Sequence, residues 1–227
     1  MNFICFFGFL FTFAAMNKEF ENILQKVSAL YRKYGIKSVT MDDVAHELGI
    51  SKKTLYQFVS DKTELVKMVV EQVSECNLSS LETKGYAEMN AIEELIEVSQ
   101  HVHQLMRDRS TTYEYDLKKY YPDIYCSLLS ARRKLMFESM IANIRKGKKE
   151  GIYRSELDEM IISKLHLLRT ECLQSSEIFN EEELHSPNFF REILIYHING
   201  LATDKGRKIL KDNEDRLAMP KEDLIIP

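Results

Sequence analysis

Apolar residues recur every three or four positions in the stretch that begins at Lys18, which is the spacing of one face of an α-helix. Charged side chains fall largely outside this stripe, so the helix should bury one side and expose the other. Gly35 is expected to end the helix, because glycine readily adopts the left-handed conformation found just after a helix. The apolar stripe consists of Phe20, Ile23, Leu24, Val27, Leu30, Tyr31 and Tyr34.

The next residues predict two shorter helices separated by a very short turn. Thr40 is a natural N-cap for the first of them, two aspartates occupy its first turn, and Gly49 ends it. One apolar residue follows, and Ser51 then caps the segment KKTLYQFV. Helical spacing predicts that Leu55 and Phe58 of this segment face inward.

A further helix is predicted from about Thr63 to beyond Val73, so residues 17–75 should form four helices. The second and third of these, with their short turn, have the pattern of a helix-turn-helix. Caps and glycine turns also occur in any small helical bundle. What the third helix leaves exposed favours the DNA-binding interpretation.

Polar side chains occupy the outer face of the third predicted helix. Lysine and tyrosine can hold phosphates, and glutamine and lysine can read base edges in a major groove. Two solvated lysines alone are a weak signal, but Thr40 and Ser51 place hydroxyl and N–H groups at two helix N-termini, where phosphates bind. Lys37 and Lys62 could lie on the same surface. The outer face itself carries Lys52, Lys53, Tyr56 and Gln57, with Thr54 at its edge.

The overall charge restricts how nucleic acid could bind. The formal net charge of the 227 residues is −4, which excludes a uniformly basic nucleic-acid coat. Acidic and basic side chains are equally numerous over residues 17–75. DNA binding would therefore depend on segregated charge, and it should weaken as salt is added.

The remainder of the chain, residues 77–227, also reads as helical, with few glycines and prolines and many good helix formers. The segment SSEIFNEEELHSP is predicted to be a loop. The expected helices are Tyr86–Arg107, a short one capped by Ser110 or Thr111, Asp123–Lys149, Leu157–Gln174, Asn188–Leu201 and Asp204–Asp212. The fold class is therefore all-α.

The contiguous run YGIKSVTMDDVAHELGISKKTLYQFVSDKTEL resembles the DNA-binding region of the TetR/AcrR family of bacterial transcriptional regulators. This resemblance implies that Thr40 and Lys62 clamp phosphates, and that the third helix lies in or along the major groove. The groove-facing residues would be Lys53, Thr54, Tyr56 and Gln57. The family often has Gly where this chain has Lys53, and His or Tyr where it has Gln57. These departures would alter the operator sequence and leave the docking mode unchanged.

The same resemblance implies a two-domain organisation. Residues 16–76 would be the DNA-binding domain, with the helix-turn-helix at about 39–58. Residues 77–227 would be a larger helical domain that binds a small ligand and forms a homodimer through its last two large helices. Aromatic residues early in this domain could line the ligand pocket, although most such residues at helical spacing belong to a core. The candidate pocket residues are His103, Met106, Tyr113, Tyr120 and Phe137.

Residues 1–15 carry no charged side chain and are rich in phenylalanine. They lack the positive n-region of a secretory signal, and the apolar run from Phe3 to Ala15 falls short of the about 20 residues that cross a membrane. Because TetR-family chains usually begin a few residues before the first helix, we expect a mis-called translation start, with Met16 as the native one. An apolar arm packed on the first helix and a membrane tether are the alternatives.

No catalytic, metal or cofactor site is predicted. The four cysteines are scattered and form no CxxC pair, which is typical of a reduced cytosolic protein. Cys76, Cys126 and Cys172 are expected to be core thiols. The sequence contains no glycine-rich phosphate loop and no GxSxG motif.

These observations predict a cytoplasmic, homodimeric regulator that binds double-stranded operator DNA, acts as a repressor and responds to a small-molecule effector. The alternative is a helical interaction protein that keeps the helix-turn-helix shape without binding DNA. A helical enzyme would need convergent carboxylates or metal ligands, which the sequence does not offer. A membrane-tethered regulator would need residues 1–15.

Overall fold

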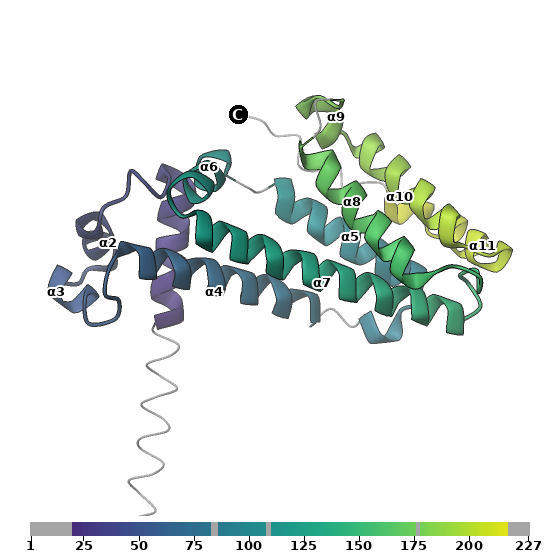
Figure 1. The fold of residues 1–227 in the computed structure, drawn as a ribbon, viewed down its shortest axis with the longest axis horizontal. Helices are drawn as coiled ribbons and strands as arrows, with labels where there is room; N and C mark the ends of the chain where they lie inside the picture. Colours follow the sequence, from purple (N-terminus) through teal and green to yellow (C-terminus); the bar gives the residue numbers. More distant parts are fainter. Residues whose placement is uncertain (1–19, 83–85, 108–109, 176–177, 218–227) are drawn as a thin grey trace, which may run out of the picture. The chain divides into compact units, whose positions relative to one another are not determined.

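The computed structural model describes residues 20–82, 86–107, 110–175 and 178–217, which form helices joined by turns (Figure 1). Within these ranges the only extended pairing is an isolated bridge between Tyr153 and Ala202. The all-α prediction is therefore confirmed. Residues 1–15, for which a mis-called start was predicted, lie outside the described residues. No helix in the described ranges is long and apolar enough to cross a membrane.

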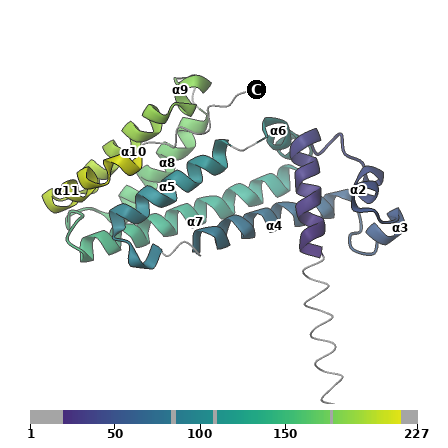
Figure 2. The ribbon, with the colours of Figure 1, turned by 180° about the vertical axis from the view of Figure 1, so that it is seen from behind.

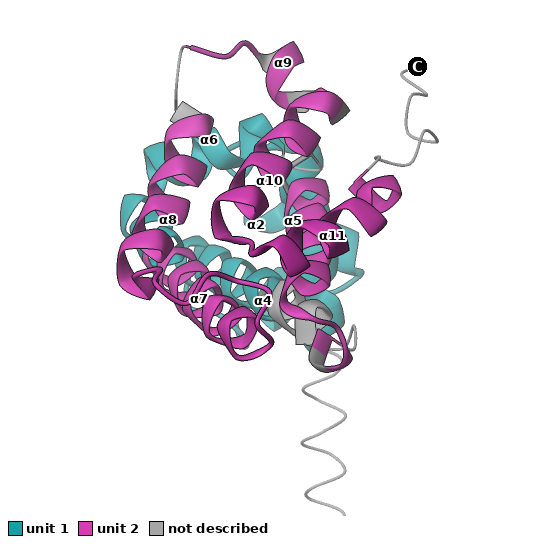
Figure 3. Ribbon diagram, turned by 90° about the vertical axis from the view of Figure 1, so that its right-hand side faces the viewer, with its two compact units in different colours: residues 1–81, 109–129 teal, residues 82–108, 130–227 magenta. Residues whose placement is uncertain are grey.

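The chain divides into two compact units, coloured separately in Figure 3. Unit 1 contains residues 1–81 and 109–129, and unit 2 contains residues 82–108 and 130–227. The elements of unit 1 are the first helix (20–34), α2 (Met41–Leu48), α3 (Lys52–Leu55), α4 (Lys62–Glu82), α6 (Thr111–Tyr120) and the start of α7 (Pro122–Lys149). Two stretches that are far apart in the sequence thus build the first unit.

The core of unit 1 is formed by the inward faces of its helices. The first helix contributes Val27 and Tyr31, both fully buried, and α6 contributes Leu117, which is 1% exposed. Figures 1 and 2 both show α6 beside the first helix. The helix-turn-helix is therefore held by a core that includes a helix from a later part of the chain.

Unit 2 is built from helices that follow α4 and α6 in the sequence. Its elements are η1 (Tyr86–Glu88), α5 (Ala91–Arg107), the rest of α7, α8 (Glu159–Ser175), α9 (Glu181–His185), α10 (Pro187–Leu201), α11 (Asp204–Asp212) and η2 (Glu214–Leu217). The sequence predicted α8, α10 and α11 closely, because their apolar positions recur at helical spacing and their ends carry clear breaks.

A buried hydrogen-bond network fixes the start of α5 against α7 in unit 2. The Tyr153 hydroxyl lies 3.1 Å from Asn143 Oδ1 and 3.2 Å from the carbonyl oxygen of Ala91, and Asn143 Nδ2 donates to the same carbonyl at 2.9 Å. A Cβ at Gly147 would collide with the Tyr153 ring, so only glycine allows this approach. Because all of these polar groups are satisfied, the network positions the helices without an unpaired buried donor.

Three local predictions outside the helix-turn-helix were wrong. The helix predicted from Tyr86 begins at Ala91, because the Asn90 side chain accepts the backbone N–H groups of residues 92 and 93 at 3.1 Å. The segment predicted to be a loop contains α9, which starts with a capping box between Asn180 and Glu183.

The third wrong prediction concerns the cysteines. The thiols of Cys126 and Cys172 are free and exposed, although both were expected in the core. They lie on the outer sides of α7 and α8, where helical spacing was a weaker guide than on the strongly amphipathic helices. The Cys76 side chain lies outside the described residues.

Candidate nucleic-acid interface

The first helix of the helix-turn-helix, α2, begins with a complete capping box. Thr40 Oγ1 accepts the Asp43 N–H at 3.2 Å, and Asp43 Oδ2 accepts the Thr40 N–H at 2.8 Å and its hydroxyl at 2.7 Å. These bonds from Thr40 hold the pKa of Asp43 below its usual value. Val44 and Ala45 are buried, and Gly49 ends the helix with φ of 68°. The predicted cap and stop of this helix are both confirmed.

The turn into α3 is fixed by a second cap. Ser51 Oγ accepts the Thr54 N–H at 3.0 Å and lies 2.7 Å from the Thr54 hydroxyl. Leu55, 1% exposed, then anchors the short helix in the core, as predicted. The cap and this one apolar anchor determine which side of α3 faces outward.

The prediction that Phe58 faces inward was wrong. The helix ends at Leu55, and Phe58 is 39% exposed and stacks on Phe20 with ring centroids 5.5 Å apart. Val59, 3% exposed, takes the buried position. A run of eight residues at helical spacing could not reveal that the helix would end after its first turn.

The outer side of α3 presents the polar residues that the sequence indicated. Lys53, Tyr56 and Gln57 are exposed, and Thr54 is half-buried at the edge. Lys53 makes no ion pair or side-chain hydrogen bond within the described part of the chain. This surface therefore offers an ammonium, a phenol and an amide that could each meet phosphate or a base edge.

Lys52 is held differently from its neighbour. Its Nζ lies 2.8 Å from Asp42 Oδ2 of α2, and this hydrogen bond raises the pKa of Lys52. Both side chains are solvent-exposed, so the pair contributes little to stability. Its main effect is that the Asp42 carboxylate offsets one of the two positive charges of α3.

Lys37 and Lys62, the two other predicted cations, lie close together beside α6. Lys62 Nζ donates to the Lys37 carbonyl oxygen at 3.3 Å, and partial burial lowers the pKa of Lys62. Lys37 Nζ donates to the Tyr120 hydroxyl at 2.9 Å and lies 4.7 Å from the centre of that ring. The Lys37 ammonium is thus directed to α6.

The sequence did not reveal the role of Asp116. This side chain is 6% exposed, and its Oδ2 accepts the backbone N–H of Lys37 at 2.8 Å. A Cβ at Gly35 would lie 2.9 Å from the same oxygen, so α6 closely approaches the turn before α2. The two partners are 79 residues apart, and no local pattern signals such a contact.

The candidate pocket residues fall in both units. Tyr113 packs against the core of unit 1, and Tyr120 is bonded to Lys37 in the same unit. His103 and Phe137 belong to unit 2, where the His103 ring lies 4.5 Å from the Phe190 ring. The Met106 side chain lies outside the described residues.

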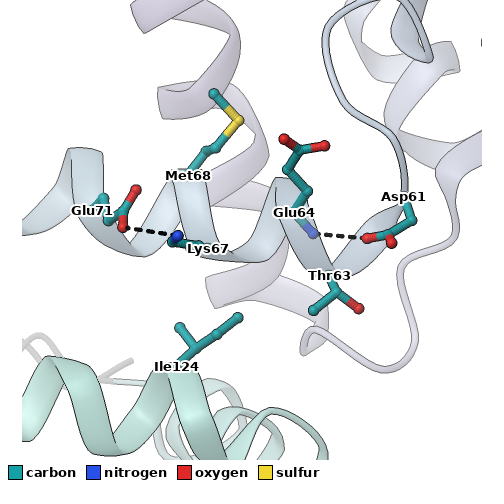
Figure 4. Close-up of a pocket in the computed structure, with 7 residues that line it drawn as sticks. All are labelled: Asp61, Thr63, Glu64, Lys67, Met68, Glu71 and Ile124. Atoms are coloured by element: carbon teal, nitrogen blue, oxygen red, sulfur yellow. Dashed lines mark hydrogen bonds and ion pairs between the residues drawn. The ribbon is translucent and has the colours of Figure 1, made fainter.

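A surface hollow of about 490 Å³ lies along the first turns of α4, with Ile124 of α7 on its other side (Figure 4). Three carboxylates, from Asp61, Glu64 and Glu71, line it, and Lys67 pairs with Glu71 at 3.9 Å. This acidic lining is unsuited to a phosphate backbone. Among the described residues no group of three or more His, Cys, Asp or Glu side chains gathers as metal ligands would.

Comparison with known proteins supports the interpretation of the helix-turn-helix. The sequence model of bacterial regulatory proteins of the tetR family matches residues 23–69. The Bacillus subtilis (strain 168) protein described as uncharacterized HTH-type transcriptional regulator YvaF is 32% identical over 109 residues. The match covers 48% of this chain and 57% of that protein, so it spans less than two thirds of the relative.

Solved structures show the same fold. A transcriptional regulator from Cytophaga hutchinsonii ATCC 33406 is similar with a TM-score of 0.70 at 13% identity, over 81% of this chain and 98% of that one. The TetR family protein CprB from S. coelicolor A3(2) gives 0.60 at 14% identity, over 89% and 98%. At these identities the likeness concerns the fold alone.

The family match over residues 23–69 and the shared all-helical fold show a helix-turn-helix of the kind found in bacterial regulatory proteins of the tetR family. The helix-turn-helix region, residues 23–69, is thus similar to that of the tetR family, as the resemblance in the sequence indicated.

Proposed function

We propose that the chain is a cytoplasmic homodimer that binds double-stranded operator DNA, represses transcription and is controlled by a small-molecule effector. The observation that carries the DNA-binding part is the presentation of α3. Leu55 and the Ser51 cap fix this helix, while Lys53, Tyr56 and Gln57 remain exposed. A short helix held in this way can enter a major groove with its polar side first.

The proposed contacts fall into two groups. Lys53, Tyr56 and Gln57 would reach the groove, and the remaining residues would hold the phosphate backbone or the edge of the groove. Lys52 would act with Asp42 beside it, and Lys37 would have to turn from Tyr120 to reach a phosphate. The complete proposed surface is Lys37, Thr40, Ser51, Lys52, Lys53, Thr54, Tyr56, Gln57 and Lys62.

Fluorescence anisotropy on labelled DNA from upstream of the reading frame tests this surface over a salt series. We expect tight, sequence-selective binding that weakens with salt and is lost in the double variant Lys53→Ala, Tyr56→Ala. Lys67→Ala is the matched control, because Lys67 is also exposed but lies on α4 beside Glu71. Equal binding of the double variant would instead favour an interaction protein that keeps the helix-turn-helix shape only.

The homodimer is proposed from an apolar stripe on α8. Ile161, Leu165 and Leu168 follow each other at helical spacing and are 56%, 54% and 57% exposed. A stripe of this kind usually marks an interface, and a two-fold interface lets one chain cover it with its own copy. Tyr196 on α10, 82% exposed, would belong to the same interface.

Sedimentation velocity tests the dimer. We expect Leu165→Glu with Leu168→Glu to give monomers, because two charges would have to be buried in an apolar contact. Leu135→Glu on α7, where the leucine is 38% exposed, is the matched control and should remain dimeric. A dimer that survives the double change would place the interface elsewhere.

The effector is proposed to bind in the C-terminal helices and to change the spacing of the two α3 helices in the dimer. The sequence predicted His103, Met106, Tyr113, Tyr120 and Phe137 as its lining. Tyr113 and Tyr120 belong to unit 1, so the proposal keeps His103, Met106 and Phe137, which belong to unit 2. Effector binding can shift the DNA-binding equilibrium only by the difference between its affinities for the conformation that binds DNA and the conformation that does not. A ligand that binds the protein and leaves its DNA affinity unchanged would contradict this part of the proposal.

A further inference from the structure

Two histidines from different helices meet inside unit 2. His166 Nδ1 of α8 lies 3.2 Å from His197 Nε2 of α10, and the rings are 4.9 Å apart between centroids. The guanidinium of Arg169, one turn further along α8, reaches the same Nδ1 at 3.2 Å. Both histidines are half-buried, so the cluster is partly shielded from water.

The hydrogen bonds determine the charge of the cluster. Arg169 can only donate, so Nδ1 of His166 acts as the acceptor and His197 donates to it through Nε2. The His166 ring is therefore neutral. Burial, and then the positive charge of Arg169, lowers the pKa of His166 to about 4 and that of His197 to about 2. Arg169 carries the only positive charge of the three.

No carboxylate accompanies this charge within the described part of the chain. The groups that act on the three side chains are the cluster members themselves, and Arg169 Nε is buried without a hydrogen-bond partner. Burying a guanidinium without a counter-charge is costly. A half-buried group that is always protonated thus lacks a carboxylate partner within the described part of the chain.

Other arginines of unit 2 show the contrast. Six of them lie within ion-pair distance of a carboxylate. These are Arg133, Arg145, Arg154, Arg191, Arg207 and Arg216, paired with Glu171, Glu159, Glu156, Glu192, Asp204 and Glu97 respectively. Arg169 differs from these six in having no carboxylate partner within the described part of the chain.

The surroundings of the cluster are polar on α8 and aromatic on α10. Ser163, one turn before His166, is fully buried, and its hydroxyl has no partner in the described part of the chain. On α10, Phe190 lies two turns before His197 and contacts the His103 ring of α5. Ser163 thus adds a second unsatisfied polar group on α8 to that of Arg169.

We propose that Arg169, with His166 and His197, binds the carboxylate of a small organic acid. This inference rests on the proposed function, since it assigns a chemical class to the effector. The planar guanidinium matches a carboxylate in a bidentate arrangement, and the buried Nε–H gains its missing acceptor. The negative charge would also favour proton uptake by an imidazole, which could then donate to the second carboxylate oxygen.

Thermal unfolding and calorimetry on the full chain test the site with acetate, butyrate, octanoate and benzoate. The matched alcohols are added in parallel, and sodium chloride keeps the ionic strength constant. We expect at least one acid to raise Tm with concentration and its alcohol to have no effect. Arg169→Met should weaken binding of that acid at least tenfold, whereas the exposed pair variant Arg145→Met should not.

The same variant separates a ligand site from a structural one. Without acid, Arg169→Met should unfold at the same or a higher temperature than the unchanged chain, because it removes a buried unpaired charge. No Tm change with any of the four acids, or an unchanged response of Arg169→Met, would overturn the site. A dimer that is lost in Arg169→Met without acid would also overturn the site, because a second copy of the chain would then supply the missing carboxylate.

DNA binding is measured separately on the same samples. An acid that binds through Arg169 and alters operator affinity supports both the site and its role as effector. An acid that binds through Arg169 without altering operator affinity overturns the effector role and retains the carboxylate site. Failure of the chain to bind DNA at all would contradict the proposed function, while the thermal experiment would still decide the site.

Discussion

Asp116 Oδ2 accepts the backbone N–H of Lys37 at 2.8 Å, which ties α6 to the turn that precedes the helix-turn-helix. The carboxylate is 6% exposed, so the bond is shielded from water. Lys37 Nζ bonds to the Tyr120 hydroxyl of the same helix at 2.9 Å, but at an exposed position. One helix thus holds this turn through a buried contact and an exposed one.

Asp116→Ala is expected to lower the free energy of unfolding by about 2 kcal/mol, because a part-buried backbone N–H loses its charged acceptor. Tyr120→Phe removes only the exposed bond and should change stability by less than about 0.5 kcal/mol. Urea denaturation of both variants measures the difference. Equal stabilities would show that the turn does not depend on the buried contact.

Gly35 and Gly49 form a matched pair for substitution. Both have positive φ, 83° and 68°, so alanine at either should cost about 1–2 kcal/mol of backbone strain. At Gly35 a new Cβ would also lie 2.9 Å from Asp116 Oδ2 and from Thr112 Cγ2, whereas at Gly49 it would meet nothing within 4 Å. We therefore expect Gly35→Ala to be the more destabilising in chemical denaturation; the reverse order would contradict the close approach of α6.

Lys52 and Lys53 are adjacent but should contribute unequally to DNA affinity. Lys52 is paired with Asp42 at 2.8 Å, and Lys53 has no such partner in the described part of the chain. We expect Lys53→Ala to weaken operator binding more than Lys52→Ala, and Asp42→Asn to strengthen it by removing a repulsive charge. Replacing a lysine that contacts a phosphate should also reduce the slope of log affinity against log salt concentration by about 0.9. Anisotropy titrations that show the same loss of DNA affinity for Lys52→Ala and Lys53→Ala would refute the unequal contributions of the two lysines.

The buried histidine pair predicts loss of stability in acid. The pKa values of His166 and His197 are lowered to about 4 and about 2, while unfolded histidine titrates near about 6.5. Between these values the unfolded chain binds more protons, so stability is complete above about pH 6.5 and falls as the pH is lowered. At pH 5 the expected loss is about 2 kcal/mol for each histidine.

The control for this prediction is the double variant His166→Gln, His197→Gln. Above pH 7 its free energy of unfolding should differ from that of the unchanged chain by a constant amount. Between pH 7 and pH 5 its free energy of unfolding should fall less steeply. Denaturation midpoints measured in urea at each pH give both curves. Parallel curves over the acid range would mean that other groups cause the loss.

Sequence periodicity predicted most helices because their apolar faces are regular and their caps are chemically distinct. Thr40, Ser51 and Gly49 carried enough local information to define the helix-turn-helix. The end of α3 was missed because Phe58 has the right spacing for a core residue, yet the partly buried Phe20 ring offers it a different partner. The α9 capping box was present in the sequence as Asn180 and Glu183 and could have been found.

Contacts between distant segments could not be predicted in the same way. The bond between Asp116 and Lys37 and the meeting of His166 with His197 depend on how helices pack, and neither has a local signature. The site residues proposed from the sequence remain predictions, although most of those on α3 are exposed as they would need to be. The predicted boundary at residue 76, between the DNA-binding domain and the C-terminal domain, also remains a prediction.

The assembly of unit 1 from two separate stretches has a practical consequence for protein engineering. A gene fragment that ends at residue 81 would encode the whole helix-turn-helix but would omit Leu117 and Asp116, which complete its core and hold its turn. Such a fragment would expose apolar surface that α6 normally covers, and it should tend to aggregate. The helix-turn-helix of this chain is therefore a poor candidate for transplantation into chimeric regulators unless residues 109–129 accompany it.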